Sequence, residues 1–466
     1  MERFICSMNG MYRERIGIKL LQAGLYGCFS PVMGRLISDP TDVIFCLALA
    51  LLPAGGTVFG FSMMYWSPIS PVLIIIYALL NVRFMPRVYS RYGVFMLYPV
   101  ALMVVSMYGW ASIGFHVHTA VQTLVALISG MACLVSLDIA FRLKHLDWAY
   151  AVRLIVVAYW VSFGIGVLEF LAVHGHAPAV TWLARRVLKR NYVPNHVQFL
   201  FAEPSYVGMH VFGVLMPLYW LTKRKRVAVL TLSYALGAAA MGVGVRILID
   251  TVVALLLWLV VAVNLHRLSN IVITIAGLGT VGIGGSVMML HNPRIESMLA
   301  NGPVNGDFSA VARLFRALAP AEAWKTDWVH FLFGFGIGNL KDAIARGYES
   351  AVQTLTSMGG KPQSNEEIRL LGNPPGDHYI FTMSAYVDAI TEFGLLMCLT
   401  GVLLLLMHIT RNRAWNKMTV CWVILLVYLY IQFEGYAFYA LWLFIWVVGT
   451  RVYGQKGDSG EQLSAL

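Results

Sequence analysis

Charged side chains are scarce in this sequence. They make up 12% of its 466 residues, against roughly 25% in a typical soluble domain. Hydrophobic residues make up 59%, and the mean hydropathy is +0.70. So small a share of charge argues against a soluble protein. The composition predicts an all-α polytopic membrane protein.

The sequence also lacks the motifs of nucleotide-binding domains. It contains no P-loop and no dinucleotide fingerprint between a strand and a helix. The glycine-rich run 332–340, LFGFGIGNL, has no such frame around it. No connection on the cytoplasmic side is long enough for a nucleotide-binding domain. These absences argue against an ATP-driven pump and against a transferase with a cytosolic nucleotide-sugar domain.

Metal-ligating residues do not gather at recognisable spacings. The six cysteines lie in the amino-terminal segment or in apolar runs, so they indicate neither a disulfide framework nor a metal site. The pairs His116/His118 and His174/His176 have no further ligands at a suitable spacing. We therefore expect no metal ion and no cofactor.

Apolar runs of about 20 residues, the length that a transmembrane helix needs, recur along the chain. Lys and Arg mark every second connection, as the positive-inside bias of cytoplasmic loops requires. This bias, rather than nucleic-acid binding, is the first explanation for the net charge of +11. The pattern predicts about twelve spans with both termini cytoplasmic, near 42–62, 66–82, 94–114, 119–140, 150–173, 206–222, 227–244, 247–265, 270–290 and 388–409, with two more before residue 450.

Polar segments divide the chain further. Residues 1–41 are expected to form a cytoplasmic amphipathic lead-in, and 451–466 a cytoplasmic tail. Spans one to nine occupy 42–290, with a smaller outer loop at 174–204; a large outer loop with short helices, 291–387, precedes the last three spans at 388–450. About thirteen of the 34 Lys and Arg lie on the outer side. Topology does not explain this surplus.

Arginines on the outer side are candidate anion-binding residues. Arg246 lies in a tight turn between two apolar helices. It is either a snorkelling interfacial residue or a fixed cation for a diphosphate, with which a guanidinium pairs bidentately. Arg313 and Arg316 share one face of a helix that either lies on the bilayer surface or binds substrate. The basic segment with Arg185 and Arg186 permits the same two interpretations.

Two further residues are candidates for proton transfer. Glu203 precedes Pro204 at the expected start of a helix, where the helix dipole favours its charge. It has either that structural role or a chemical one, orienting an arginine or accepting a proton from a hydroxyl. His378 is the candidate acid or base of the large loop because the ordinary histidine pKa lies near neutrality. The alternative is an exposed histidine without a chemical role.

Two segments of the expected bundle resemble the O-antigen polymerase and ligase superfamily, the Wzy-type membrane proteins of bacterial polysaccharide assembly. FAEPSYVG (201–208) is similar to the family's Glu-Pro-Ser element at the start of a mid-chain span. MGVGVRILID (241–250) is similar to its short arginine turn, although Val245 stands where a serine is usual.

Three segments of the large loop and its end extend the resemblance. ARLFRALAPAEAW (312–324) and LFGFGIGNL are similar to the arginine helix and the glycine-rich segment of the family's periplasmic loop. SAYVDAITEFGLL (384–396) is similar to the closing segment, with Tyr386 as its tyrosine. Met383 and Ser384 stand where the family often has His-Asn, and the nearest histidine is His378. This departure favours a polymerase over a ligase.

The resemblance implies a metal-independent, inverting glycosyltransferase in the bacterial inner membrane. Such a polymerase moves a growing glycan from undecaprenyl diphosphate onto a lipid-linked repeat unit at the periplasmic face. With the candidates from the chain's own residues, the expected catalytic residues are Arg246, Arg313, His378 and Glu203, and the expected substrate-binding residues are Arg316, Arg185, Arg186 and Tyr386.

Two other functions stay open. One is a ligase that delivers the glycan to an acceptor such as the lipid A core, and the other is a polysaccharide flippase or transporter. The expected partners are a lipid-linked oligosaccharide, membrane lipid, and a chain-length regulator and flippase of the same pathway.

Overall fold

The computed structural model describes residues 40–55, 68–175, 186, 188, 197–241, 243–262, 293–302, 304–372, 380–433 and 439–450, with the single positions 272, 275 and 279. Within these ranges the chain is helical and has no strand, which confirms the all-α prediction for the described part. The α-helices are α3 (Pro40–Ala50), α4 (Ser70–Leu80), α5 (Met85–Ser112), α6 (Val117–Leu137), α7 (Trp148–His174), α9 (Val207–His210), α10 (Met216–Thr222), α11 (Lys225–Ala240), α12 (Val245–Ala262), α14 (Pro293–Asn301), α15 (Phe308–Thr326), α16 (Trp328–Phe333), α17 (Leu340–Ser357), α18 (Glu366–Gly372), α19 (Ala385–Arg411), α20 (Lys417–Tyr430) and α21 (Tyr439–Thr450).

Short 3₁₀ and π segments connect or extend these helices. The 3₁₀ turns are η1 (Val82–Phe84), η3 (Pro204–Tyr206) and η5 (Pro362–Ser364), and the π segments are η2 (Asp138–Leu143) and η4 (Val211–Leu215).

Four helices are long and apolar enough to cross a membrane. With their flanking turns they span Val82–Ser112, Val117–Leu143, Trp148–His174 and Ala385–Arg411, and they correspond to the third, fourth, fifth and tenth predicted spans. On α5, five apolar side chains that are each more than half exposed recur three or four residues apart, which places them on one face. An exposed apolar stripe of this length is what lipid contact requires. The twelve-span count stays a prediction.

Other apolar helices are too short to cross a bilayer. Helices α3 and α4 have 11 residues each, about 16 Å, which is roughly half of the hydrocarbon core. The first predicted span ends early because the chain turns at 51–55, a stretch with Pro53 and Gly55. The Gly55 N–H donates to the Leu200 carbonyl at 3.0 Å, so a distant segment satisfies the freed backbone.

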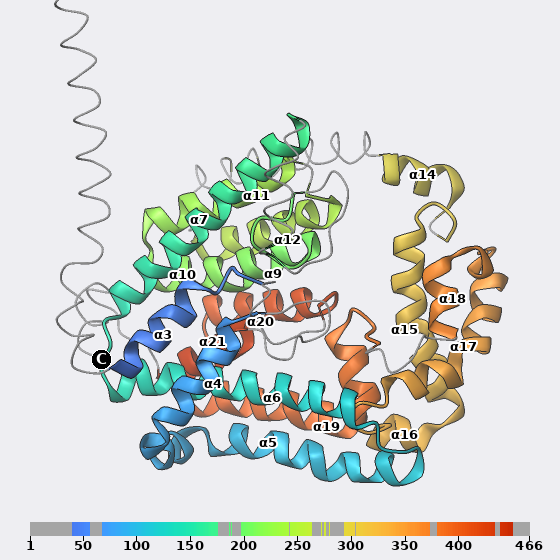
Figure 1. Ribbon diagram of the computed structural model, residues 1–466, viewed down its shortest axis with the longest axis horizontal. Helices are drawn as coiled ribbons and strands as arrows, with labels where there is room; N and C mark the ends of the chain where they lie inside the picture. Colours follow the sequence, from blue (N-terminus) through green and yellow to red (C-terminus); the bar gives the residue numbers. More distant parts are fainter. Residues whose placement is uncertain are drawn as a thin grey trace, which may run out of the picture.

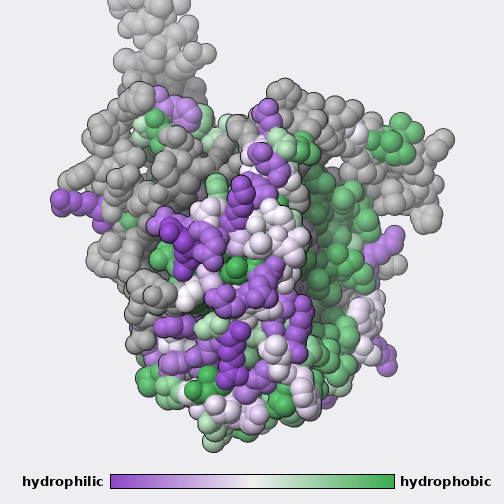
Figure 2. Space-filling model, turned by 90° about the vertical axis from the view of Figure 1, so that its right-hand side faces the viewer, coloured by the Kyte–Doolittle hydropathy of each residue, from purple (hydrophilic) through white to green (hydrophobic). Residues whose placement is uncertain are grey.

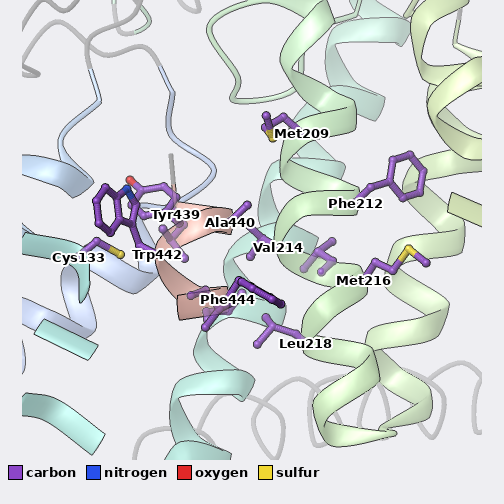
Figure 3. Packing of buried hydrophobic residues seen from close by; sticks show 14 of the residues in the cluster. Cys133, Met209, Phe212, Val214, Met216, Leu218, Tyr439, Ala440, Trp442 and Phe444 are labelled. Carbon is purple, nitrogen blue, oxygen red and sulfur yellow. The ribbon is translucent and has the colours of Figure 1, made fainter. Parts of the chain in front are cut away.

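That distant segment, 197–206, enters the bundle without regular structure at its start. Phe199 has a φ of +55° and is fully buried against Gly166, where any side chain would overlap its ring. Irregular backbone at membrane depth is tolerated only where protein covers it. Helix α21 fills the neighbouring space: Trp442 lies toward Cys133 of α6, whereas Ala440 and Phe444 face Val214 and Leu218 (Figure 3).

The helices of the large loop gather at one end of the bundle. Helices α15, α16, α17 and α18 lie at the right of Figure 1, beside the ends of α5, α6 and α19. Helices α15, α17 and α18 share a small core that includes Phe315, Ile344 and Ile368. Figure 2 shows polar residues gathered on this face and apolar residues along one flank.

Basic residues gather at the opposite end. Arg142 pairs with the fully buried Asp138 at 2.5 Å, and Lys144 pairs with Asp42 at 2.6 Å. Arg91 donates to the Gly449 carbonyl at 2.6 Å. The loop and these cations therefore lie at opposite ends of the long helices.

Candidate functional site

Arg246 lies in the first turn of α12, as the predicted helix junction requires. Its side chain is 14% exposed, and its Nε lies 3.7 Å from Asp250 Oδ2, one helical turn further on. This distance is too long for a hydrogen bond. Within the described residues the guanidinium has no closer partner, although five N–H donors are available on it. The site is suited to an anion that brings its own acceptors.

Asp250 connects the arginine turn to two other elements. The Tyr428 hydroxyl of α20 donates to Asp250 Oδ1 at 2.7 Å. Asp250 Oδ2 rests on Gly208 of α9, where a methyl group would overlap it. The structure therefore joins two of the motifs singled out in the sequence, the arginine turn and FAEPSYVG.

Glu203 has the place that the sequence predicts. Its backbone is extended, and Pro204 follows as the first residue of η3. The carboxylate is half-buried and has no partner among the described residues. Two residues further on, the buried Ser205 hydroxyl also lacks a hydrogen-bond partner within the described chain. The start of η3 thus carries two polar groups that protein atoms of the described part do not satisfy.

Arg313 and Arg316 lie one turn apart on α15, as predicted. Arg316 is already engaged: its Nη1 donates to the Phe381 carbonyl at 3.1 Å, and its Nη2 lies 3.8 Å from Glu367. Its guanidinium also stacks over the Phe381 ring, at 5.3 Å from the centroid. These contacts give Arg316 a structural role, that of holding the chain just before α19. Arg313 is half-buried.

The segment that Arg316 holds is attached on its other side to the bundle. The Ala385 N–H donates to the Phe433 carbonyl at 3.0 Å, and the Tyr386 hydroxyl donates to the Val427 carbonyl at 3.0 Å. Met383, within this segment, has a φ of +68°. Such a backbone is strained for a residue with a side chain, and strain of this kind gathers at functional sites.

Asp388 fixes this strained turn. Its Oδ1 accepts from the Thr382 N–H at 3.0 Å and from the Thr382 hydroxyl at 2.6 Å. The Asp388 side chain is fully buried. The turn at Met383 is therefore held from both sides, by Arg316 of the loop and by Asp388 of α19.

The glycine-rich run anchors the loop to the bundle. Helix α19 is interrupted at Gly394, with a φ of +81°. The interruption frees the carbonyls of Thr391 and Glu392, which accept from Phe335 N–H at 2.7 Å and Gly336 N–H at 3.0 Å. The buried Glu392 carboxylate accepts from Gly338 N–H at 2.9 Å. The glycines thus serve packing and backbone pairing, and LFGFGIGNL meets the Glu-x-Gly-Leu of the closing segment.

No protein-family model, curated protein or solved structure matches this chain. The interpretation of the site therefore rests on its own residues. Two of the predicted site residues, His378 and Arg185, lie outside the described residues. A third, Arg186, is described as a single exposed position.

The two arginine helices have different neighbours. Helix α12 packs on α20 and α9, whereas α15 packs on α17, α16 and α18. Phe433 links two other elements: its carbonyl accepts from the Ala385 N–H at the start of α19, and its ring lies 5.0 Å from that of Tyr206 in η3. FAEPSYVG is thus linked to the arginine turn through Gly208 and Asp250, and to the start of α19 through Tyr206 and Phe433.

Sequence reasoning missed the support of Arg246. The spacing of Arg246 and Asp250, four residues apart on a helix, was a usable signal because such residues face each other. Tyr428 gave no local signal, since it is 178 residues distant along the chain.

A second polar cluster, also missed, lies beside α16. The Ser112 hydroxyl is 2.8 Å from His330 Nε2, and His330 Nδ1 is 2.6 Å from Asp327 Oδ2. This order matches that of a hydrolytic triad. However, the hydroxyl also donates to carbonyls of the last turn of α5, Tyr108 at 2.9 Å and Gly109 at 3.3 Å. The partial negative charge of those carbonyls would destabilise an oxyanion beside the Ser112 hydroxyl, which argues against a catalytic triad. We therefore assign the cluster a structural role, that of attaching the loop to α5.

Histidines elsewhere also have structural partners. His116 Nε2 lies 3.1 Å from Asp342 Oδ2 of α17, and His174 Nδ1 lies 3.0 Å from the Phe170 carbonyl. Among the described residues, no group of three or more His, Cys, Asp or Glu is arranged to hold a metal ion.

Proposed function

We propose that this protein is a polysaccharide polymerase that transfers a growing glycan from undecaprenyl diphosphate onto a lipid-linked repeat unit at the outer face of the bacterial inner membrane. The observation that carries the proposal is the Arg246 guanidinium. It is mostly buried, its neighbour Asp250 lies against Gly208 of FAEPSYVG, and within the described residues no atom accepts a hydrogen bond from it.

The reaction places its greatest demand on the leaving group. The acceptor hydroxyl oxygen attacks the anomeric carbon, the bond from that carbon to the diphosphate oxygen breaks, and the diphosphate leaves with the electron pair. Negative charge grows on the diphosphate in the transition state. Preorganised cations at that position lower the barrier, and Arg246 and Arg313 are assigned this role.

The acceptor hydroxyl must lose its proton to a base. Glu203 is one candidate, because its carboxylate has no partner among the described residues and it belongs to FAEPSYVG, whose Gly208 lies against Asp250. His378 is the other. The segment around Met383 and Tyr386 is assigned to the acceptor, since it is strained and borders both the loop and the bundle. Arg185 and Arg186 remain assigned to the glycan.

A transporter is the second candidate function. Helices α3, α4, α20 and α21 are short and apolar, and broken helices are typical of transporter sites. The polymerase is preferred because Arg316 and the strained turn at Met383 lie where the loop helices meet the bundle.

Reconstitution with lipid-linked repeat units from the producing cell tests the proposal. The expected product is a ladder of longer glycans on undecaprenyl diphosphate. Arg246→Ala and Arg313→Ala should each lower the rate by about 10²-fold or more, the usual loss when one preorganised donor is removed. Arg153→Ala is the matched control, because Arg153 Nε contacts only the Ala149 carbonyl of its own helix, among described partners.

Two outcomes would contradict the polymerase. A parent protein that forms no ladder, yet moves the lipid-linked units across a proteoliposome membrane, is a transporter. Delivery of the glycan to lipid A core, without a ladder, indicates a ligase.

A further inference from the structure

The way in which Arg246 is held extends the proposed function, on which this inference rests. A guanidinium on a long side chain has many rotamers, and recognition of a diphosphate needs one of them. Arg246 has a single described neighbour of opposite charge, Asp250, at 3.7 Å from Nε. The contact is on the Nε side, which leaves the terminal Nη groups to a ligand.

Asp250 cannot itself contact the substrate. Its side chain is 2% exposed, and it lies between α12, α20 and α9. One of its oxygens is held by a hydrogen bond, and the other is buried without a hydrogen-bond partner among the described residues. Tyr428 donates to Oδ1 at 2.7 Å, and Oδ2 fills the space above Gly208.

Stability alone does not account for this arrangement. A buried ion pair at more than hydrogen-bond distance is weak evidence of stabilisation, because desolvation offsets the attraction. Well-packed apolar residues would serve the fold at least as well. Furthermore, only a glycine at position 208 leaves room for the Asp250 carboxylate, and a glycine inside a helix lowers its stability. This loss of stability is explained if the Asp250 carboxylate positions a cation that has a function.

We propose that Asp250, Tyr428 and Gly208 are positioning residues that fix the Arg246 guanidinium for a lipid diphosphate. Tyr428 holds the carboxylate, Gly208 gives it room, and the negative charge of the carboxylate attracts the guanidinium to this side of α12. The ligand class is a polyprenyl diphosphate, whose oxygens match the Nη pair of Arg246.

Binding of geranylgeranyl diphosphate to the full-length protein in nanodiscs tests this proposal without any glycan transfer. Tyr428→Phe and Asp250→Asn should each weaken binding roughly tenfold or more, because a misplaced cation loses its geometry. Gly208→Ala should do the same by displacing the carboxylate. Tyr98→Phe is the matched control: it also removes a tyrosine hydroxyl that donates to another helix, to Met397 O at 2.7 Å.

The decisive readout is coupling through Arg246. In an Arg246→Ala background, Tyr428→Phe should cause no further loss, because both changes remove the same interaction. If Tyr428→Phe weakens binding equally with and without Arg246, it acts through the general fold and the inference is wrong.

The same measurement separates this inference from the proposed function. If Arg246→Ala binds the diphosphate as the parent does, the proposed anion site fails, and the inference fails with it. If Arg246→Ala loses binding while Tyr428→Phe and Asp250→Asn match Tyr98→Phe, only the inference fails. Tyr428→Phe removes one oxygen atom, so it keeps the test available should Asp250→Asn not fold.

Discussion

Charge pairing decides which basic residues are available for chemistry. The large loop, 291–387, has eight Lys and Arg against nine Asp and Glu, so it carries almost no net charge. Arg316 and Arg346 pair with Glu367 and Asp327, respectively. Part of the basic surplus noted in the sequence is thus neutralised locally. Sequence alone could not reveal this, because the partners lie 19 or more residues away.

The positions of two candidate residues relative to helix starts were nevertheless predicted correctly from the sequence. Arg246 and Glu203 have the helix positions that their sequence context predicts, because a tight turn and a Pro at the first helical position are local signals. Arg316 was predicted to bind substrate, whereas its described contacts are structural. Only the tertiary structure brings Phe381 within its reach.

Glu322 provides a test at the residue scale. The Lys325 hydrogen bond, aided by Ser350 and Thr354, lowers the pKa of this carboxyl in α15. A depressed pKa stabilises the fold above the ordinary carboxyl pKa, and the stabilisation is lost as the pH falls through the folded-state pKa. Glu322→Gln should therefore lower the unfolding temperature by a few degrees at neutral pH, and the difference should shrink in acid.

Hydrogen exchange of α15 and α17, followed at both pH values, locates this effect. The control is Glu349→Gln on the exposed side of α17. A difference between Glu322→Gln and the parent that stays constant into acid would mean that the charge is not responsible.

At the scale of elements, long and short helices differ in how well the sequence predicts them. The long spans were placed within a few residues at most ends, except that α5 begins nine residues before the predicted 94. A continuous apolar run is a local property. The first two spans were predicted longer than α3 and α4, although Pro53 and Gly55 marked the break in the first span. Their ends depend on contacts such as that of Gly55 with Leu200, which no local pattern contains.

The docking of the glycine run on the bundle can be tested by adding single methyl groups. Gly109 of α5 faces the Phe335 backbone, and a Cβ there would overlap it. Gly338 has a φ of +85°, and its Cβ would come within 2.5 Å of the Ala120 nitrogen. Gly109→Ala and Gly338→Ala should each destabilise the protein by about 1–3 kcal/mol, the usual cost of overpacking.

Thermal unfolding in detergent measures this cost. Gly164→Ala is the matched control, because nothing lies within 4 Å of its Cβ position and alanine favours a helix. If Gly109→Ala and Gly338→Ala unfold at the temperature of Gly164→Ala, the loop is not anchored at these glycines.

At the scale of the whole molecule, the loop helices and a group of paired cations lie at opposite ends of the long helices (Figure 1). The positive-inside bias predicts that the cations face the cytoplasm and the loop faces outward. Alternating basic joints in the sequence carried this prediction. How the loop meets the bundle was beyond sequence reasoning, because it depends on the interruption of α19.

Labelling of single cysteines tests the orientation. In a variant without the six native cysteines, Gln363→Cys in the loop should react with a membrane-impermeant maleimide on spheroplasts. Ser90→Cys at the opposite end should react only after permeabilisation. Reaction of both from the same side would contradict the predicted orientation.

The contact between Gly208 and Asp250 also predicts which positions should covary among homologous sequences. A side chain at 208 and a carboxylate at 250 exclude each other in this backbone, because a methyl group would occupy the place of Oδ2. In homologous chains the two positions should therefore covary: glycine with aspartate, or a larger residue with a shorter partner. Tyr428 should follow the aspartate and be replaced freely where the aspartate is lost. Such a three-position pattern would allow divergent members of the lineage to be recognised even where overall similarity has faded.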